Sequence, residues 1–479
     1  MQDSADDWLH EAEMMEKVYE NTYLNISADH SKDATGGCFT ERLVYKVAPC
    51  RYKAPRIGWV KLVAPFAFMK SLDNSALSER AWVVQERLMS PRVLHFTDVQ
   101  LFWECAELFA CETFAEGLPT SYDGESSRHY RDNRSLVSID QRGRPDYYKM
   151  WCQICQDYSR GMLTDLSDKL IAFSGIAREF QSRLPRDKYL AGIWKEDLVS
   201  GLLWSVPTVD EMPIQANGAK DDCAMPFIAA SPTPKFRAPS WSWLSIDGHV
   251  SWSLSPDAHP IVRLLEATVD LVNDGDPSGA MRGGSIVIRG QLRSASWMQK
   301  GGLDLVVLDG KHGDQMHELL KHEHSPQSGF FSIQRDTGSM FPVKDIFCLL
   351  VRRFARSTYR HNEMIEGLVL RSTEVEDTYQ RLGHFGARGI IPCMALKYKL
   401  RPLAQEMDRP WDKFRLPPLD GKKRDFYLDS TIPFDVLLKL QAKASKGSAE
   451  ALPADTYLGD APYDETLFEK LEDRTITLI

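Results

Sequence analysis

The chain lacks the features that mark several large classes of protein. None of its apolar runs approaches the roughly 18 residues that a membrane-spanning helix needs, and its acidic first residues do not resemble a secretory leader. It contains no G-x-x-x-x-G-K-[ST] loop, no G-x-G-x-x-G fingerprint after a strand and no G-x-S-x-G elbow. The sequence therefore gives no support for a membrane span, a P-loop nucleotide hydrolase, a Rossmann dinucleotide-binding domain or an elbow-type hydrolase.

Basic charge and paired cysteines are also scarce. The chain has 58 Lys and Arg residues against 67 Asp and Glu residues, a net charge of −9. Sequence-independent binding of nucleic acid needs a basic footprint, so we expect no nucleic-acid partner. The nine cysteines are odd in number and scattered, which does not indicate a disulfide framework. We therefore expect a protein of the reducing cytoplasm.

The residues that are present can build a large core. The chain has 479 residues, 43% of them hydrophobic, and this length usually forms about three domains. Ser4 and Asp7 have the spacing of a helix cap. Apolar residues then recur every three or four positions from Trp8 to Tyr19, which predicts an amphipathic helix. A short strand is predicted over Tyr23–Ala28.

Helices and strands continue to alternate after this start. Apolar spacing predicts a helix over Ser75–Met89, which ends before Pro91. Two strands follow, Arg92–Phe96 and Gln100–Cys105. Residues 112–144 are rich in Gly, Ser, Asp and Arg, which predicts a long exposed loop.

The second half changes from helices to strands. Helical spacing is found over Tyr147–Tyr158, Asp165–Arg183 and Lys195–Trp204. Beyond Ser240 the pattern is one of short strands, beginning with Ser240–Ile246. The end of the chain is first Pro-rich and then acid-leaning, which predicts a loosely attached tail. The sequence as a whole predicts an α+β fold.

One segment resembles a known family. Residues 77–96 read LSERAWVVQERLMSPRVLHF, and this string resembles the helix and strand that close the fungal heterokaryon-incompatibility (HET) domain. Residues 100–105, LFWEC preceded by Gln, look like the strand that normally follows. Residues 7–26 are similar to the preceding helix and strand of the family. Ordered points of similarity continue to residue 243, including SWSW at 240–243.

The resemblance implies a fold and a division of the chain. HET domains are distantly similar to TIR domains, which are flavodoxin-like α/β modules, and members of the family usually carry further strands before the helix that starts here. We expect five parts: 1–110 as the C-terminal part of a HET (TIR-like) domain, 111–144 as an exposed linker, 145–237 as a helical segment, 238–400 as a β-rich domain, and 401–479 as a Pro-rich and acid-leaning tail.

The resemblance also implies candidate site residues. Some TIR domains hydrolyse NAD with a Glu that follows a Trp by one helical turn, and Trp82 and Glu86 have this spacing. A carboxylate beside an indole loses solvation, which raises its pKa, and it can stabilise the positive charge that develops on ribose when the nicotinamide bond breaks. The alternative is that Trp82 is a core residue and Glu86 pairs with an arginine such as Arg80, Arg87 or Arg92.

Three further motifs have a functional and a structural interpretation. Cys152-x-x-Cys155 resembles a redox or zinc half-site, but it falls in a helical pattern and core packing is favoured. His317, His322 and His324 lie in a polar segment typical of a solvated loop, and no metal site is expected. Trp241 and Trp243 alternate as in a strand, which favours buried packing over an exposed stacking platform.

The sequence therefore predicts a protein of fungal non-self recognition whose signal leads to programmed cell death. TIR-like NAD hydrolysis is the activity that the resemblance implies, with NAD as substrate, no bound cofactor and no assigned cofactor-binding residues. The expected partners are proteins of an incompatibility system, including further copies of the chain. One alternative is a non-catalytic interaction protein, or a decayed paralogue, with an incomplete HET module. Another is an unrelated enzyme whose site lies in the β-rich half.

Overall fold

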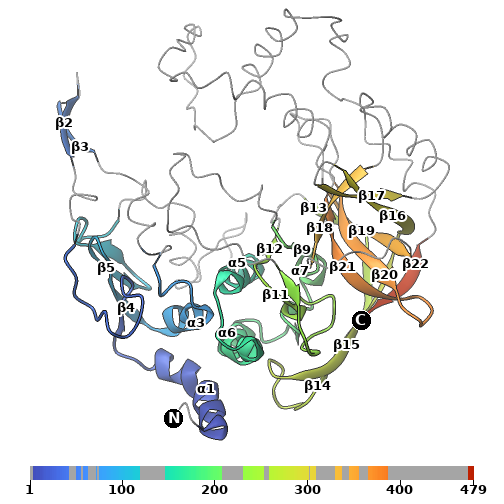
Figure 1. The fold of residues 1–479 in the computed structure, drawn as a ribbon, viewed down its shortest axis with the longest axis horizontal. Helices are drawn as coiled ribbons and strands as arrows, with labels where there is room; N and C mark the ends of the chain where they lie inside the picture. Colours follow the sequence, from blue (N-terminus) through green and yellow to red (C-terminus); the bar gives the residue numbers. More distant parts are fainter. Residues whose placement is uncertain are drawn as a thin grey trace, which may run out of the picture.

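The computed structural model describes residues 4–42, 50–54, 58–62, 72, 75–118, 146–207, 230–252, 258–300, 303–308, 330–336, 345–354, 365–386 and 473–479. Helices and strands are mixed along the chain, which confirms the predicted α+β class. Figure 1 shows the N-terminal helices and a small sheet on one side of the molecule and the β-rich part on the other. Most of the predicted loop, the three histidines from His317 to His324 and the predicted tail up to residue 472 lie outside the described residues.

The chain begins with helix α1 (Ala5–Glu20). The Ser4 hydroxyl accepts a hydrogen bond from the backbone N–H of Asp7 at 3.3 Å, so the predicted cap is confirmed. The helix places Ala12 in the core while Val18 on its other side is exposed. This amphipathic pattern matches the spacing of apolar residues in the sequence.

A four-stranded sheet follows α1, with strand order β1-β4-β5-β6. Its strands are β1 (Asn25–Ser27), β4 (Arg92–Phe96), β5 (Leu101–Cys105) and β6 (Phe109–Cys111). β1 pairs parallel to β4, whereas the other pairs are antiparallel. The connection from β1 to β4 includes the hairpin of β2 (Cys50–Ala54) and β3 (Gly58–Leu62) and the helix α3 (Ala81–Met89). The strands predicted at 92–96 and 100–105 are therefore confirmed.

Three helices join this first part to the next. After α5 (Tyr147–Arg160) and the short 3₁₀ helix η3 (Leu166–Asp168), helix α6 (Lys169–Arg183) packs against both α1 and α3. Gly175 permits this approach, since a Cβ atom there would lie 2.9 Å from the Glu16 Cβ and 3.0 Å from the Gln85 Nε2. Arg178 also donates to the Glu16 carboxylate at 2.7 Å.

The third predicted helix, Lys195–Trp204, is wrong in extent. Only α7 (Leu198–Gly201) is helical there. It is flanked by short strands: β7 (Tyr189–Leu190), β8 (Ile193–Trp194) and β9 (Trp204–Ser205). Trp194 and Trp204 are fully buried on these strands, and burial in the core takes precedence over the helical spacing of the sequence.

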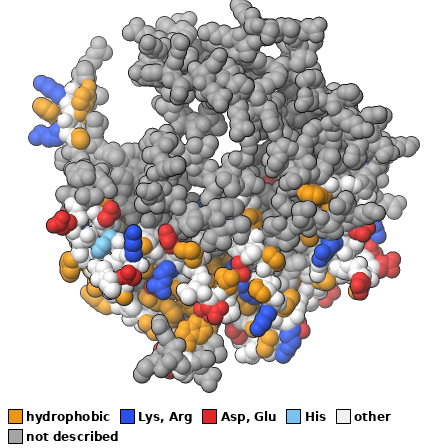
Figure 2. Space-filling view, in the orientation of Figure 1, with side chains coloured by type: hydrophobic (Ala, Val, Ile, Leu, Met, Phe, Trp, Pro, Cys, Tyr) orange, Lys and Arg blue, Asp and Glu red, His pale blue; other side chains and the backbone are white. Residues whose placement is uncertain are grey.

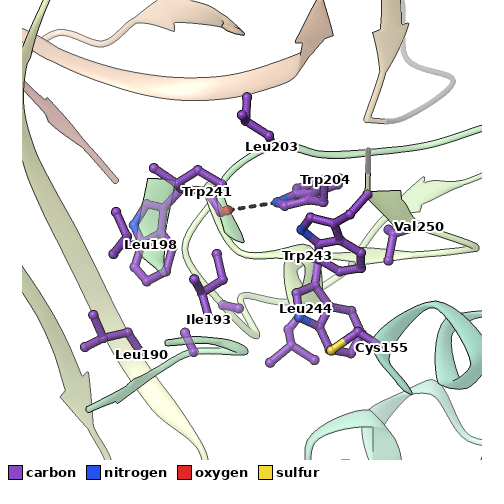
Figure 3. Packing of buried hydrophobic residues seen from close by; sticks show 14 of the residues in the cluster. Cys155, Leu190, Ile193, Leu198, Leu203, Trp204, Trp241, Trp243, Leu244 and Val250 are labelled. Atoms are coloured by element: carbon purple, nitrogen blue, oxygen red, sulfur yellow. Dashed lines mark hydrogen bonds between the residues drawn. The ribbon is translucent and has the colours of Figure 1, made fainter. Parts of the chain in front are cut away.

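Buried tryptophans and other apolar side chains pack together in one large core, part of which Figure 3 shows. Trp241 and Trp243 are both fully buried, so the prediction that they pack rather than form an exposed platform is confirmed. The strand predicted over Ser240–Ile246 is wrong up to Ser245, because residues 240–245 form a turn and the 3₁₀ helix η5 (Trp243–Ser245), and only Ile246 belongs to a strand. The nearby strands are β10 (Ser231–Pro232), β11 (Ile246–Asp247) and β12 (Ser251–Trp252).

Gly192 is the hydrogen-bond partner of two tryptophans in this core. Its φ of +90° is in the region that favours glycine, and a Cβ atom would lie 2.6 Å from the Nε1 of Trp243. The Gly192 carbonyl accepts hydrogen bonds from the indole N–H groups of both Trp151 and Trp243, each at 2.9 Å. Figure 3 shows a related contact, in which the Trp204 indole donates to the Trp241 carbonyl at 3.0 Å.

The β-rich part forms a ten-stranded sheet. Its strands are β13 (Ala258–Pro260), β14 (Arg263–Leu271), β15 (Met281–Gly290), β16 (Leu292–Lys300), β17 (Leu303–Leu308), β18 (Phe330–Arg335), β19 (Ile346–Phe354), β20 (Ile365–Ser372), β21 (Thr378–Gly386) and β22 (Arg474–Leu478). The strand order is β13-β19-β16-β17-β18-β21-β22-β15-β14, and β20 pairs with both β19 and β21. The strands β16, β17, β18, β21, β20 and β19 therefore close into a ring.

Strand β22 joins this ring to the β14–β15 hairpin. It pairs antiparallel to β15 and parallel to β21, and its side chains Ile476 and Leu478 are buried. The prediction of a loosely attached tail is therefore wrong for residues 474–478, because two buried side chains and pairing on both edges hold this strand in place. Among the helices that the structure describes, none is long and apolar enough to span a membrane.

Candidate functional site

Glu86, the predicted catalytic carboxylate, lies at the contact between α3 and α1. Its half-buried side chain forms a hydrogen bond with the Tyr19 hydroxyl of α1. Burial raises the pKa of Glu86, although this hydrogen bond and the charge of Arg80 oppose the rise. Burial and the nearby Glu86 carboxylate likewise raise the pKa of Tyr19. Glu86 is thus a desolvated carboxyl group with a phenol as its neighbour.

Trp82, the predicted supporting residue, contacts the same helix. Its ring packs edge-to-face on Trp8 of α1, with ring centroids 6.3 Å apart, and it lies against the hydrophobic core. The structure therefore brings both Trp82 and Glu86 against α1. The core role that the sequence offered as the alternative fits this position of Trp82.

The arginines considered as partners of Glu86 have different roles. Arg87 forms an ion pair with Glu104, 2.8 Å from its Nε to the Oε2. Arg92 lies over the ring of Tyr23, 5.2 Å from its centroid. Arg80 interacts with Glu86 through its charge. The structure therefore places a tyrosine beside Glu86, a neighbour that the sequence did not indicate.

A second group of polar residues, which we call the His95 network, lies where strands β4 and β5 meet helix α3 and the loops that carry Asp29 and Ser75. It consists of Asp29, Ser75, Arg87, His95 and Glu104, all of them buried. His95 Nδ1 is 2.9 Å from the Asp29 carboxylate and His95 Nε2 is 3.0 Å from that of Glu104. Ser75 donates to Asp29 at 3.2 Å and Arg87 donates to Glu104 at 2.8 Å. With His95 protonated, two positive and two negative groups balance in the core.

The sequence held a weak signal for this network. Side chains alternate between the two faces of a strand, and on β4 both Val93 and His95 point to the buried face. On β5 the buried face carries Phe102 and Glu104. A histidine and a glutamate at core positions of adjacent strands indicate a buried ion pair, provided that the register is known.

The environment of His95 favours its charged form. Burial lowers the pKa of His95, but the hydrogen bonds to Asp29 and Glu104 outweigh it, and the net pKa is raised. The charge of Arg87 also opposes the rise. Since both ring nitrogens face carboxylate oxygens, the imidazolium can donate on both sides.

Raising the pH is expected to remove the stabilisation that protonated His95 provides. The folded chain holds this proton more tightly than the unfolded chain, whose histidine pKa is about 6.5. The contribution is fully present below that pKa and is lost as the pH rises through the raised folded pKa. The measurement is the free energy of unfolding in urea at a series of pH values from about 6 to 9.

His95→Gln is the control for this experiment. Burial lowers the pKa of Lys169 to about 7 and raises that of Asp197 to about 7, so both titrate in the same range. Both groups are present in wild type and variant, so the difference in unfolding free energy between the two proteins isolates the contribution of His95. This difference should shrink as the pH rises. A difference that stays constant would mean that His95 does not titrate there.

The cysteine motif has no sign of reactivity. Cys152 and Cys155 are fully buried in α5, and burial raises the pKa of both thiols well above its usual value. The core-packing interpretation of this motif is confirmed, since a reactive thiol needs a lowered pKa and access to solvent. Within the part of the chain that the structure describes, no group of three or more His, Cys, Asp or Glu side chains could hold a metal ion.

Surface charge on the drawn face is mixed. Figure 2 shows Lys and Arg side chains interspersed with Asp and Glu side chains over the described residues. A continuous basic field is the usual mark of a surface that binds nucleic acid. The visible described surface has no such field.

The comparisons with known proteins agree with the resemblance. The family model described as heterokaryon incompatibility protein (HET) matches residues 1–86. The match covers α1, β1 and the first part of α3, and its last residue is Glu86. The predicted HET resemblance is thereby confirmed, and this segment links the chain to heterokaryon incompatibility. No curated protein and no solved structure matches the chain.

Proposed function

We propose that this protein acts in fungal non-self recognition and that its signal leads to programmed cell death. The observation that carries the proposal is the HET match over residues 1–86. The parallel pairing of β1 with β4, and the helix α3 before β4, support an α/β module related to TIR domains. The protein partners would be components of an incompatibility system.

We further propose that the HET segment cleaves NAD and that Glu86 is the catalytic residue. Its raised pKa suits a carboxyl group that must exchange protons near neutral pH. In its ionised form it would stabilise the positive charge that develops on ribose as the bond to nicotinamide breaks. The Tyr19 hydroxyl, which is hydrogen-bonded to it, would orient the carboxylate.

Glu86→Gln is expected to abolish both NAD consumption and killing. The amide keeps the size of the side chain and its hydrogen-bonding oxygen, but it can neither carry the charge nor exchange the proton. We expect a loss of at least about 100-fold in NAD turnover. The measurement is expression of wild type and variant in a fungal cell, scored for cell death and for NAD level.

The matched control is Glu107→Gln, at an exposed residue between β5 and β6. It should leave death and NAD level unchanged, and both variants should unfold at the temperature of the wild type. A stable Glu86→Gln variant that still consumes NAD and kills would remove Glu86 from the mechanism. Death without NAD loss in the wild type would reject the enzymatic step and retain the signalling role.

One observation favours a second candidate function. The Glu86 carboxyl group is engaged by Tyr19 where α1 packs on α3, a position that also suits a structural residue. In that case the chain is a non-catalytic interaction protein whose HET segment serves as a scaffold. This candidate predicts that Glu86→Gln changes stability and leaves the NAD level of the cell unaffected.

A further inference from the structure

Basic residues gather in one stretch of a chain that is acidic as a whole. Residues 42–72 contain no Asp or Glu, whereas the whole chain has a net charge of −9. The basic residues of this stretch are Arg42, Lys46, Arg51, Lys53, Arg56, Lys61 and Lys70. Charge of one sign that is concentrated in this way attracts partners of the opposite sign. The stretch is therefore suited to an anionic partner.

The strands that the structure describes in this stretch are β2 and β3. They pair with each other in a two-stranded sheet of their own. Figure 1 shows this hairpin beyond the four-stranded sheet, on the side of the molecule away from the β-rich part. An isolated pair of strands is at best marginally stable in water, and it gains stability when a further surface packs on it. The hairpin is thus a projecting element that a partner can stabilise.

One face of the hairpin combines two cations with an indole ring. Arg51 and Lys53 are two residues apart on β2 and so share a face, and Lys53 lies opposite Trp59 of β3. The guanidinium carbon of Arg51 is 5.4 Å from the centroid of the Trp59 ring, and the Nζ of Lys53 is 6.0 Å from it. All three side chains are exposed, Trp59 to 64%. This face therefore presents positive charge and an aromatic ring side by side.

The hairpin is apolar as well as basic, and this combination favours a bilayer over a nucleic acid. More than half of residues 42–72 are hydrophobic, against 43% of the whole chain. On the other face of the hairpin Tyr52 lies opposite Val60 and is 51% exposed. A nucleic acid would meet the charges and leave these apolar side chains in water. At the surface of a bilayer, Trp and Tyr rings lie at the level of the headgroups, and Lys and Arg are attracted to anionic lipids.

We propose that the β2–β3 hairpin binds the surface of a bilayer that contains anionic phospholipid. The hairpin enters the headgroup layer, so that both of its faces contact lipid. Arg51 and Lys53 pair with the anionic headgroups, and the rings of Trp59 and Tyr52 lie among them. The hairpin is a different surface from that of Glu86, and the proposal does not depend on NAD cleavage.

The test is co-sedimentation of the full chain with lipid vesicles. One set of vesicles contains phosphatidylcholine alone, and the other contains equal parts of phosphatidylcholine and phosphatidylserine. We expect at least about tenfold tighter binding to the vesicles with phosphatidylserine, since each basic residue near an anionic leaflet contributes about a factor of five. Raising the salt from about 0.1 M to about 1 M should weaken this preference, because the Debye length falls from about 10 Å to about 3 Å.

Two variants separate the charges from the indole. Arg51→Gln combined with Lys53→Gln is expected to abolish the preference for phosphatidylserine. Trp59→Ala keeps both charges, so it should weaken binding to these vesicles several-fold and leave the salt dependence unchanged. Because all three side chains are exposed, both variants should unfold at the temperature of the wild type.

Arg263→Gln combined with Lys235→Gln is the matched control, because it removes the same two charges from exposed positions outside the hairpin. It should leave the preference unchanged. Equal losses for the two double variants would overturn the proposal, because the position of the charge would then not matter. Equal binding to both sets of vesicles, or binding to neither, would also overturn it. So would a single-stranded polyuridine probe that binds more tightly than the vesicles and displaces them, because the occupant would then be a nucleic acid.

Discussion

Arg381→Met is expected to lower the free energy of unfolding by about 3–5 kcal/mol, the usual cost of removing one partner of a buried ion pair. The Arg381 side chain has no exposed surface, and its guanidinium donates to Asp336 and to the carbonyl oxygens of Leu202 and Trp204. It also lies 3.5 Å from the centroid of the Trp204 ring. Methionine would leave a buried carboxylate and two buried carbonyls without their donor.

The matched control for Arg381→Met is Arg474→Met. Arg474 pairs with Asp377 at 2.8 Å, but both side chains are close to half exposed. Solvent screens such a pair, so we expect a loss below about 1 kcal/mol. Both variants are measured by unfolding in urea. If both variants lost a similar free energy of unfolding, the burial of Arg381 would not determine how much this residue contributes to stability.

Trp243→Ala is expected to destabilise the protein by about 3–5 kcal/mol, as for other large core aromatics. Its indole N–H donates to Gly192, and its ring meets that of Phe173 edge-to-face with centroids 5.1 Å apart. The ammonium of Lys169 lies 5.1 Å from the centroid of the same ring. The alanine variant loses the burial of the indole, the hydrogen bond and this cation–π contact together.

Trp59→Ala serves as the comparison for Trp243→Ala. Trp59 lies on β3 and is 64% exposed, so its loss should change the unfolding free energy by less than about 0.5 kcal/mol. Thermal unfolding of the two variants provides the measurement. If Trp243→Ala unfolds at the temperature of the wild type, the aromatic cluster is not the main core of the molecule.

Elements with a regular pattern could be predicted from the sequence. The cap at Ser4 and the alternation along Arg92–Phe96 gave helix α1 and strand β4 their bounds to within a residue or two. The strand prediction for Ser240–Ile246 failed because Trp-Ser-Trp alternates as the residues of a strand do. Its conformation is set by distant partners: the Ser242 hydroxyl donates to Ala191, and the Trp243 indole donates to Gly192. Local spacing carries no information about such contacts.

The candidate site also has one part that the sequence predicted and another part that it could not predict. Trp82 and Glu86 are one turn apart on a helix, so their spacing could be read directly. Tyr19 could not be connected to Glu86, since only the packing of α1 on α3 brings the two together. The His95 network needs the register of β4 and β5 together with the position of the loop that carries Asp29. A single sequence gives neither.

The position of β22 between β15 and β21 has a consequence for the rate of folding. Gly290 and Arg474 are paired across this sheet although they are very far apart along the chain. Closing so long a loop costs conformational entropy before the pairing repays it, and topologies rich in distant contacts fold slowly. We therefore expect the β14–β15 hairpin to form early during refolding and its union with the ring of strands to be among the last events.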